Sequence, residues 1–262
     1  MKTVLSQRNI IKQNYLLNNS SYKLSALSLD IVMGLITEVK NEDKDFNIYE
    51  FYIKDIEKKF DKQIDERTLH KVAEELLSST ITVKKDKDFL KMNWVSSFEY
   101  LNSQRKFEIS FDPKLKPYLL ELKENFVLGY FSEIIKIRSE YSKRIYMLLR
   151  QRVNIGQWTI NLDELQNLLM VPNSYKRYKE FKRSVLKTAE KQIQENSSLG
   201  FTIEEIKEGR KTTKLKFIIS DTSTKQKVKL NKQSKSNNTG LKALENWYSE
   251  DNVTINEGVN FE

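Results

Sequence analysis

One order of predicted elements occurs twice along this 262-residue chain, and it limits the possible folds more than any other property of the sequence. Each copy contains an amphipathic helix, a short strand, a short helix, a long amphipathic helix and a β-hairpin. Apolar residues spaced by three or four predict the helices, and alternating apolar and polar residues predict the strands. This is the element order of a winged helix-turn-helix. The sequence therefore predicts an α+β, mainly helical fold of tandem duplicated winged helix-turn-helix domains.

The first copy spans residues 23–112 and begins with a helix that Ser25 or Ser28 caps. Residues 1–22 precede it and are predicted to form an N-terminal arm. The predicted elements of this copy are a helix at 24–40, a strand at 46–52, helices at 54–60 and 65–78, and strands at 80–84, 90–100 and 106–111.

The second copy spans residues 133–220 and follows a connector, 113–132, that contains a bridging helix at 117–124. Trp158 is predicted to anchor its core. The predicted elements of this copy are a helix at 134–149, a strand at 158–160, helices at 162–170 and 175–196, and a hairpin made of 201–207 and 213–219.

The C-terminal segment, 221–262, has no hydrophobic periodicity in its first half, which is rich in Lys, Ser, Asn and Thr. This composition predicts a disordered linker and tail. Residues 221–240 hold 5 basic residues and 1 acidic residue, whereas residues 241–262 hold 1 basic and 5 acidic residues together with Trp247 and Tyr248. Docking on a host replication protein, folding back onto the second copy, and an inert solubilising role all remain open for this tail.

The chain has no cysteine, one histidine (His70) and seven glycines, which excludes several classes of function. Disulfide frameworks, thiolate zinc sites and cysteine nucleophiles need cysteine, and the metal site of rolling-circle DNA-nicking enzymes needs paired histidines. No two glycines have the spacing of a nucleotide-binding loop. We therefore expect no catalytic residues, no metal and no cofactor. A signal peptide or spanning helix is also missing, so we expect a cytoplasmic protein without a membrane partner.

The net charge of +9 is concentrated in the second copy. Residues 1–112 hold 18 basic and 18 acidic residues, whereas residues 133–220 hold 18 basic and 10 acidic residues, a net charge of +8. A drift in composition would raise both halves equally, so this asymmetry indicates a polyanionic partner for the second copy. The neutral first copy is rich in Ile, Leu, Phe and Tyr, which favours a dimer interface there.

The helix at 175–196 is the predicted DNA-recognition helix. Its apolar face contains Tyr178, Phe181, Val185, Ala189 and Ile193, and its opposite face is basic. A solvated face is the common alternative, but this helix holds the second place in a helix-turn-helix and precedes a hairpin with a basic tip. Glu180 would accept a hydrogen bond from a cytosine amino group. The DNA-binding candidates are Lys176, Arg177, Lys179, Glu180, Arg183 and Lys187 on the helix and Arg210 and Lys211 on the hairpin.

Four further basic residues are weaker candidates for contacts with phosphate. Lys143 and Arg144 are placed near the start of a helix, where they could contact phosphate and where a solvated position is the alternative. Arg67 and Lys71 lie on the long helix of the first copy and would give it an auxiliary DNA contact. His70 lies between them and is expected to be a surface residue.

Several blocks of sequence resemble a known family. They are YSKRIYMLLR at 141–150, GQWTINLDEL at 156–165, YKRYKEFKRSVLK with AEKQI at 175–193, and LSALSLD at 24–30. Their order and spacing resemble the signature of the theta-type plasmid replication initiators of the Rep_3 superfamily. The resemblance covers about residues 4–219.

The resemblance implies a first winged helix that dimerises and a second that recognises DNA. It also implies that monomers bind tandem origin repeats, called iterons, and that dimers bind an inverted repeat and repress their own gene. The expected partners are double-stranded origin DNA, a second copy of the chain in a monomer–dimer equilibrium, and host initiator or helicase-loading proteins. A winged-helix transcriptional repressor would show the same folds, and tandem repeats beside the gene would distinguish an initiator from it. A DNA-nicking replication enzyme is the least favoured alternative.

Overall fold

The computed structural model describes residues 2–3, 10–40, 43–85, 87–120 and 126–221. The described residues from Lys2 to Ser220 form one compact unit. The tail that the sequence predicts to be disordered lies, from residue 222 onward, outside the described residues. Within the described ranges, no helix is long and apolar enough to cross a membrane.

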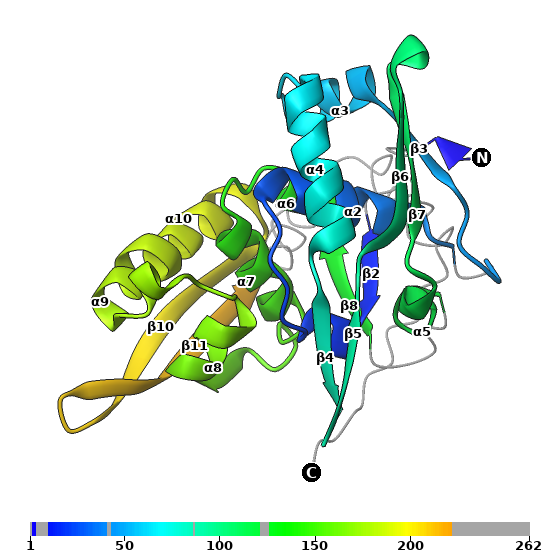
Figure 1. Ribbon diagram of the computed structural model, residues 1–262. Coiled ribbons are helices and arrows are strands. Elements are labelled where there is room, and N and C mark those ends of the chain that lie inside the picture. The colour runs from blue at the N-terminus through cyan, green and yellow to red at the C-terminus, as the bar shows by residue number, and fades with distance from the viewer. Residues whose placement is uncertain (1, 4–9, 41–42, 86, 121–125, 222–262) are drawn as a thin grey trace, which may run out of the picture. The chain divides into compact units, whose positions relative to one another are not determined.

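The first winged helix has the predicted order of elements (Figure 1). Ser25 and Asp65 cap its two longer helices, because each side chain accepts a hydrogen bond from a backbone N–H three residues further on. The elements are α2 (Ala26–Glu38), β3 (Tyr49–Tyr52), α3 (Ile53–Phe60), α4 (Glu66–Ser78), β6 (Val95–Leu101) and β7 (Lys106–Phe111).

Strands β6 and β7 form the wing of this domain, and β7 also pairs with β3. With β1 (Lys2–Thr3), which runs parallel to β3, they make a four-stranded sheet in the order β1-β3-β7-β6. The ring of Phe107 stacks on the rings of Phe51 and Phe98, with 4.9 Å between centroids in each pair. Such cross-strand aromatic pairs stabilise neighbouring strands.

The strand predicted at 90–100 is two strands, so that prediction is wrong. Strand β5 (Asp88–Met92) pairs with β4 (Ile81–Lys85) in a separate hairpin. The backbone leaves this hairpin at Asn93 and Trp94, because Trp94 is fully buried and packs edge-on against Tyr22, with ring centroids 4.8 Å apart.

Residues 10–22, predicted as an N-terminal arm, are built into the fold. Strand β2 (Ile10–Asn14) pairs antiparallel with β8 (Phe126–Tyr130), and Leu17 and Tyr22 are buried. Burial of these apolar side chains stabilises the segment against the rest of the chain. Hydrophobic periodicity gives no sign of the pairing between β2 and β8, because these two strands lie far apart in the sequence.

The bridging helix predicted at 117–124 is observed only as a short helix at Lys116–Leu119. Residues 121–125 lie outside the described part of the chain. The helix predicted at 134–149 begins later, because the backbone at Ser139 is extended and the Ser139 side chain caps the helix that follows. The elements of this region and of the N-terminus are α1 (Tyr15–Asn18), a 3-10 turn (Pro113–Leu115), α5 (Lys116–Leu119), α6 (Phe131–Ile134) and α7 (Glu140–Arg150).

The second winged helix also has the predicted order, with a sheet in the order β10-β11-β9. Trp158 stacks on Phe217 with ring centroids 5.3 Å apart, as expected for a core anchor. The long helix, 178–196, consists of α9, a π-helical segment and α10. The elements are β9 (Gln157–Asn161), α8 (Leu162–Leu168), a 3-10 turn (Asn173–Tyr175), α9 (Tyr178–Phe181), the π-helical segment (Lys182–Leu186), α10 (Lys187–Asn196), β10 (Leu199–Glu208) and β11 (Lys211–Asp221).

Helix α7 contributes to the cores of both winged helices. It contacts α2 and α10, and every residue from 141 to 149 is buried. The buried apolar residues from Ile11 to Ile219 form one continuous cluster. The two winged helices therefore share a hydrophobic core.

Candidate nucleic-acid interface

The long helix turns its apolar face to the core. Phe181, Val185, Ala189 and Ile193 are 0% exposed, and Tyr178 is half-buried at the N-terminal end. These residues are spaced by four, so in a regular helix of about 3.6 residues per turn they would drift around the axis by about 40° at each step. The π-helical segment Lys182–Leu186 has a wider turn and removes part of this drift. The predicted inner face is therefore fully packed.

The opposite face of the long helix carries exposed cations. Lys179, Arg183 and Lys187 are all exposed. Arg183 Nη2 lies 2.6 Å from Glu180 Oε2, and Lys187 Nζ lies 2.6 Å from Glu190 Oε2. Exposed pairs of this kind are worth about 0–1 kcal/mol. A phosphate or a base edge can therefore replace either carboxylate at little cost.

Lys176 and Arg177 lie in the turn before the long helix. The helix starts at Tyr178 and not at residue 175, because the backbone at Arg177, its N-cap, is extended. Lys176 Nζ donates a hydrogen bond to Asn167 Oδ1 at 2.8 Å, which ties this turn to α8. Both basic side chains are exposed.

The wing of the second winged helix carries the other predicted cations. Strands β10 and β11 meet at Gly209 and Arg210, and Gly209 has a φ of 60°, which glycine adopts without strain. Arg210 and Lys211 are exposed at this tip.

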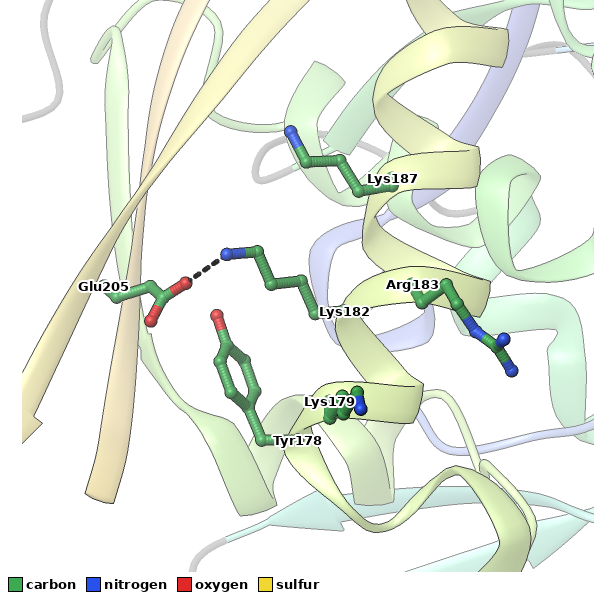
Figure 2. A pocket seen from close by; sticks show the side chains of 6 residues that line it. All are labelled: Tyr178, Lys179, Lys182, Arg183, Lys187 and Glu205. Atoms are coloured by element: carbon green, nitrogen blue, oxygen red, sulfur yellow. Dashed lines mark hydrogen bonds and ion pairs between the residues drawn. The ribbon is translucent and has the colours of Figure 1, made fainter. Parts of the chain in front are cut away.

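A carboxylate on the wing connects it to the long helix (Figure 2). Glu205 accepts hydrogen bonds from Lys182 Nζ at 2.6 Å and from Thr212 Oγ1 at 3.2 Å, and the ring of Tyr178 lies beside it. The Lys182 ammonium lowers the pKa of Glu205 to about 2, with help from the hydroxyls of Tyr178 and Thr212. Burial, and then the charge of Glu205, raise the pKa of Tyr178. Glu205 is therefore ionised at neutral pH.

A shallow hollow of about 450 Å³ lies between the long helix and the wing. Four cations line it, of which Lys182 pairs with Glu205, while Arg183 and Lys187 form exposed pairs with carboxylates of their own helix. Because exposed pairs are weak, a phosphate group can compete for these cations. No three acidic or histidine side chains in the described ranges are arranged to hold a metal ion. The hollow is lined by Tyr178, Lys179, Lys182, Arg183, Lys187 and Glu205.

The candidates on the first winged helix lie on α4. Arg67 and Lys71 are exposed there, and neither lines the hollow. His70 is exposed beside them, with Nε2 3.9 Å from Glu66 Oε1, which agrees with the expected surface position.

Lys143 and Arg144 are buried, with exposed fractions of 1% and 4%. Lys143 pairs with Asp30 of α2. The Arg144 guanidinium stacks 3.7 Å above the ring of Tyr22 and donates to the Ser20 carbonyl at 2.7 Å. Helix α2 and residues 20–22 cover this face of α7, so neither the predicted phosphate contacts nor the alternative solvated positions fit these two residues.

Sequence reasoning missed Lys182 and Glu205. Alternation along β10 places Glu205 on the same face as Leu199, Phe201 and Ile203, which pack toward the core. That alternation is the signal that could have identified Glu205. Lys182 is identified by its partner on the wing and by no pattern within its own helix.

A helix with a cationic outer face beside a hairpin with a cationic tip is how winged-helix proteins meet duplex DNA. Fold and surface thus define a tandem winged-helix DNA-binding protein. The sequence matches two family descriptions, "Initiator Replication protein, WH1" over residues 9–150 and "Initiator Rep protein, WH2" over residues 161–219. The chain belongs to this family of replication initiators, which confirms the resemblance, and it is a DNA-binding initiator of plasmid replication. The first match includes α7, which the predicted boundary at residue 133 assigned to the second copy.

The fold is similar to that of a solved initiator structure. The crystal structure of the Pi initiator protein in complex with iteron DNA is 21% identical, with 83% of this chain and 99% of that chain covered and a TM-score of 0.64. A structure of domains 2 and 3 of RctB is 11% identical, with 74% of this chain and 80% of that chain covered and a TM-score of 0.42.

Proposed function

We propose that this initiator binds tandem iterons in double-stranded origin DNA and that its second winged helix recognises their bases. The long helix enters the major groove with Arg183 and Lys187, and the wing contacts the neighbouring backbone or minor groove with Arg210 and Lys211. The observation that carries this proposal is the cationic hollow between helix and wing. The similar fold of the Pi initiator, whose crystal structure includes iteron DNA, supports it.

The test compares a duplex that carries the repeats flanking the coding sequence with a random duplex of equal length. Arg183→Ala should weaken binding to the repeat duplex by about 1 to 3 kcal/mol, the usual worth of a bidentate base contact, and should weaken binding to the random duplex less. Lys211→Ala should weaken both alike, because a phosphate contact does not depend on sequence.

Lys114→Ala is the control for this experiment, because Lys114 is exposed in the first half of the chain and outside the hollow. It should leave both affinities unchanged. Equal losses on the two duplexes for Arg183→Ala would contradict base recognition by that residue. A flat response of affinity to salt would contradict phosphate binding altogether.

We also propose that the first winged helix mediates self-association and that the dimer represses its own gene. Phe89 and Leu77 are 69% and 38% exposed and supply apolar surface for such a contact. Phe89→Ser should shift sedimentation of the full chain toward the monomer at an unchanged thermal midpoint, and unchanged association would contradict a role for Phe89. The full chain is needed because a fragment starting at residue 113 would lose the pairing of β8 with β2.

Auxiliary phosphate contacts from Arg67 and Lys71, and docking on host initiator or helicase-loading proteins, complete the proposal. It includes no catalytic step. Supercoiled DNA that carries the repeats should therefore stay uncut when it is incubated with the protein and Mg²⁺, and metal-dependent nicking would contradict this.

A further inference from the structure

Glu205 ties together groups from three places in the second winged helix. Its side chain is 20% exposed, it accepts a hydrogen bond from Lys182 of the long helix, and Lys207 of its own strand lies 3.9 Å away. Its third partner, Thr212 of β11, is buried. One carboxylate thus fixes the distance between the long helix and both strands of the wing.

Lys182 differs from the other cations of the long helix in where its partner lies. Arg183 and Lys187 pair with carboxylates three residues away on the same helix, at exposed fractions of 76% and 62%. Lys182 is 46% exposed and pairs across to the wing. Figure 2 shows Lys182 pointing toward Glu205 and Arg183 pointing away from it. Lys182 is therefore held inside the hollow, while its neighbours remain free to exchange partners.

An ammonium at the rim of this hollow would bind DNA phosphate if nothing held it back. Each cation that neutralises a phosphate adds affinity for any sequence, because it releases a condensed counterion. That gain is the same for the correct site and for random DNA, so by itself it leaves the ratio of the two affinities unchanged. Base contacts by the long helix and the wing, by contrast, form only where the spacing of these two elements matches the site. Holding Lys182 off the DNA backbone therefore lowers affinity for every sequence, and the same ion pair keeps the spacing between helix and wing on which the ratio depends.

We propose that Glu205 is a positioning residue for DNA recognition, which keeps Lys182 off the DNA backbone and fixes the wing at one distance from the long helix. The inference rests on the proposed function of the second winged helix. Glu205 lowers the affinity for arbitrary DNA and raises the ratio of specific to non-specific affinity.

The experiment uses the full chain, the repeat duplex and the random duplex over a range of salt concentrations. Glu205→Gln should make the slope of log affinity against log salt on the random duplex steeper by about 0.9, the value for one added phosphate contact. The ratio of repeat to random affinity should fall by about tenfold, because the base contacts weaken when the wing is no longer held at one distance from the long helix. Adding Lys182→Met to Glu205→Gln should return the slope to the wild-type value, because the released ammonium is then gone.

Glu204→Gln is the matched control. Glu204 precedes Glu205 on β10, its side chain is 61% exposed, and it pairs with Lys216 at 3.2 Å and not with the long helix. The two variants lose the same charge from the same strand, but only Glu205→Gln releases Lys182. We expect Glu204→Gln to keep the wild-type ratio and slope.

An unchanged slope for Glu205→Gln would overturn the proposal. So would equal losses of affinity on both duplexes with a lowered thermal midpoint, which is what a purely structural role would produce. A wild-type chain without preference for the repeat duplex would contradict the proposed function. The difference in slope between the two Gln variants on the random duplex would still decide the proposal for Glu205.

Discussion

Asp30→Asn should destabilise the folded chain by about 3 to 5 kcal/mol, because it breaks a buried ion pair between α2 and α7. The side chains of Asp30 and Lys143 are each 1% exposed. Lys143 Nζ also donates to the carbonyl of Ile134, and Lys62 Nζ lies 4.0 Å from the other oxygen of Asp30. Burial raises the pKa of Asp30 to about 6 and lowers the pKa of Lys143, so both charges depend on each other for stabilisation.

The size of this loss in stability follows from the unpaired charge of Lys143 that the substitution leaves in the core. An amide carries no charge, so the Lys143 ammonium stays buried with a neutral amide and a backbone carbonyl as acceptors among the described residues. Removing one member of a buried pair costs about 3 to 5 kcal/mol, against a total stability of about 5 to 15 kcal/mol for a typical protein. At about 2 to 4 °C per kcal/mol, Tm should fall by roughly 6 to 20 °C.

Urea unfolding of the full chain, followed by circular dichroism, measures this loss. Asp30→Asn and Lys143→Met should each be strongly destabilising, and the double variant should lose at least about 2 kcal/mol less than their sum, because it leaves no charge unpaired. Lys62→Met is the control and should cost less than about 1 kcal/mol, because Lys62 is 44% exposed. A loss below about 1 kcal/mol for Asp30→Asn, or additive losses in the double variant, would refute the reasoning.

Three further predictions concern single positions. The pKa of Glu205 is lowered from 4.5 to about 2, so its contribution to stability is complete above pH 4.5 and is lost as the pH falls toward 2. The difference in urea midpoint between wild type and Glu205→Gln should therefore shrink from pH 6 to pH 2, and a constant difference would contradict this. Gly129→Ala would place its Cβ 2.5 Å from Met147 Sδ, and this overpacking should lower the free energy of unfolding by about 1 to 3 kcal/mol in a thermal melt. An unchanged melting curve would contradict the prediction, because it would mean that the Met147 thioether moves aside without cost. Phe181→Ala removes a side chain that is 0% exposed and should cost about 3 to 5 kcal/mol by the same measurement, whereas a loss near zero would mean that the long helix is not anchored there.

The sequence predicted those parts of the molecule whose information is local. Caps such as Ser25 and Asp65 mark helix starts, and the spacing of Phe181, Val185 and Ala189 marks the inner face of the long helix. These signals depend on neighbours within a few residues. The order of both winged helices followed from them.

Long-range packing accounts for what could not be predicted. The pairing of β2 with β8 has no periodic signature, and the charges of Lys143 and Arg144 gave no sign that α2 and residues 20–22 cover them. The pairing of Lys182 with the wing depends likewise on where β10 packs. Tertiary contacts decide these positions, and composition favours a surface role for each charged residue.

The π-helical segment in the long helix can be regarded as one residue inserted into an otherwise regular helix. Deleting one residue from Lys182–Leu186 would restore regular winding and leave Lys179 at nearly the same rotation relative to Lys187, because a π turn holds about one residue more than a regular turn. The residues before and after the segment would keep their present directions, because the wide turn already accommodates the extra residue. A single-codon deletion in this segment, without any substitution, would thus remove one side chain from the long helix and leave the direction of the others unchanged.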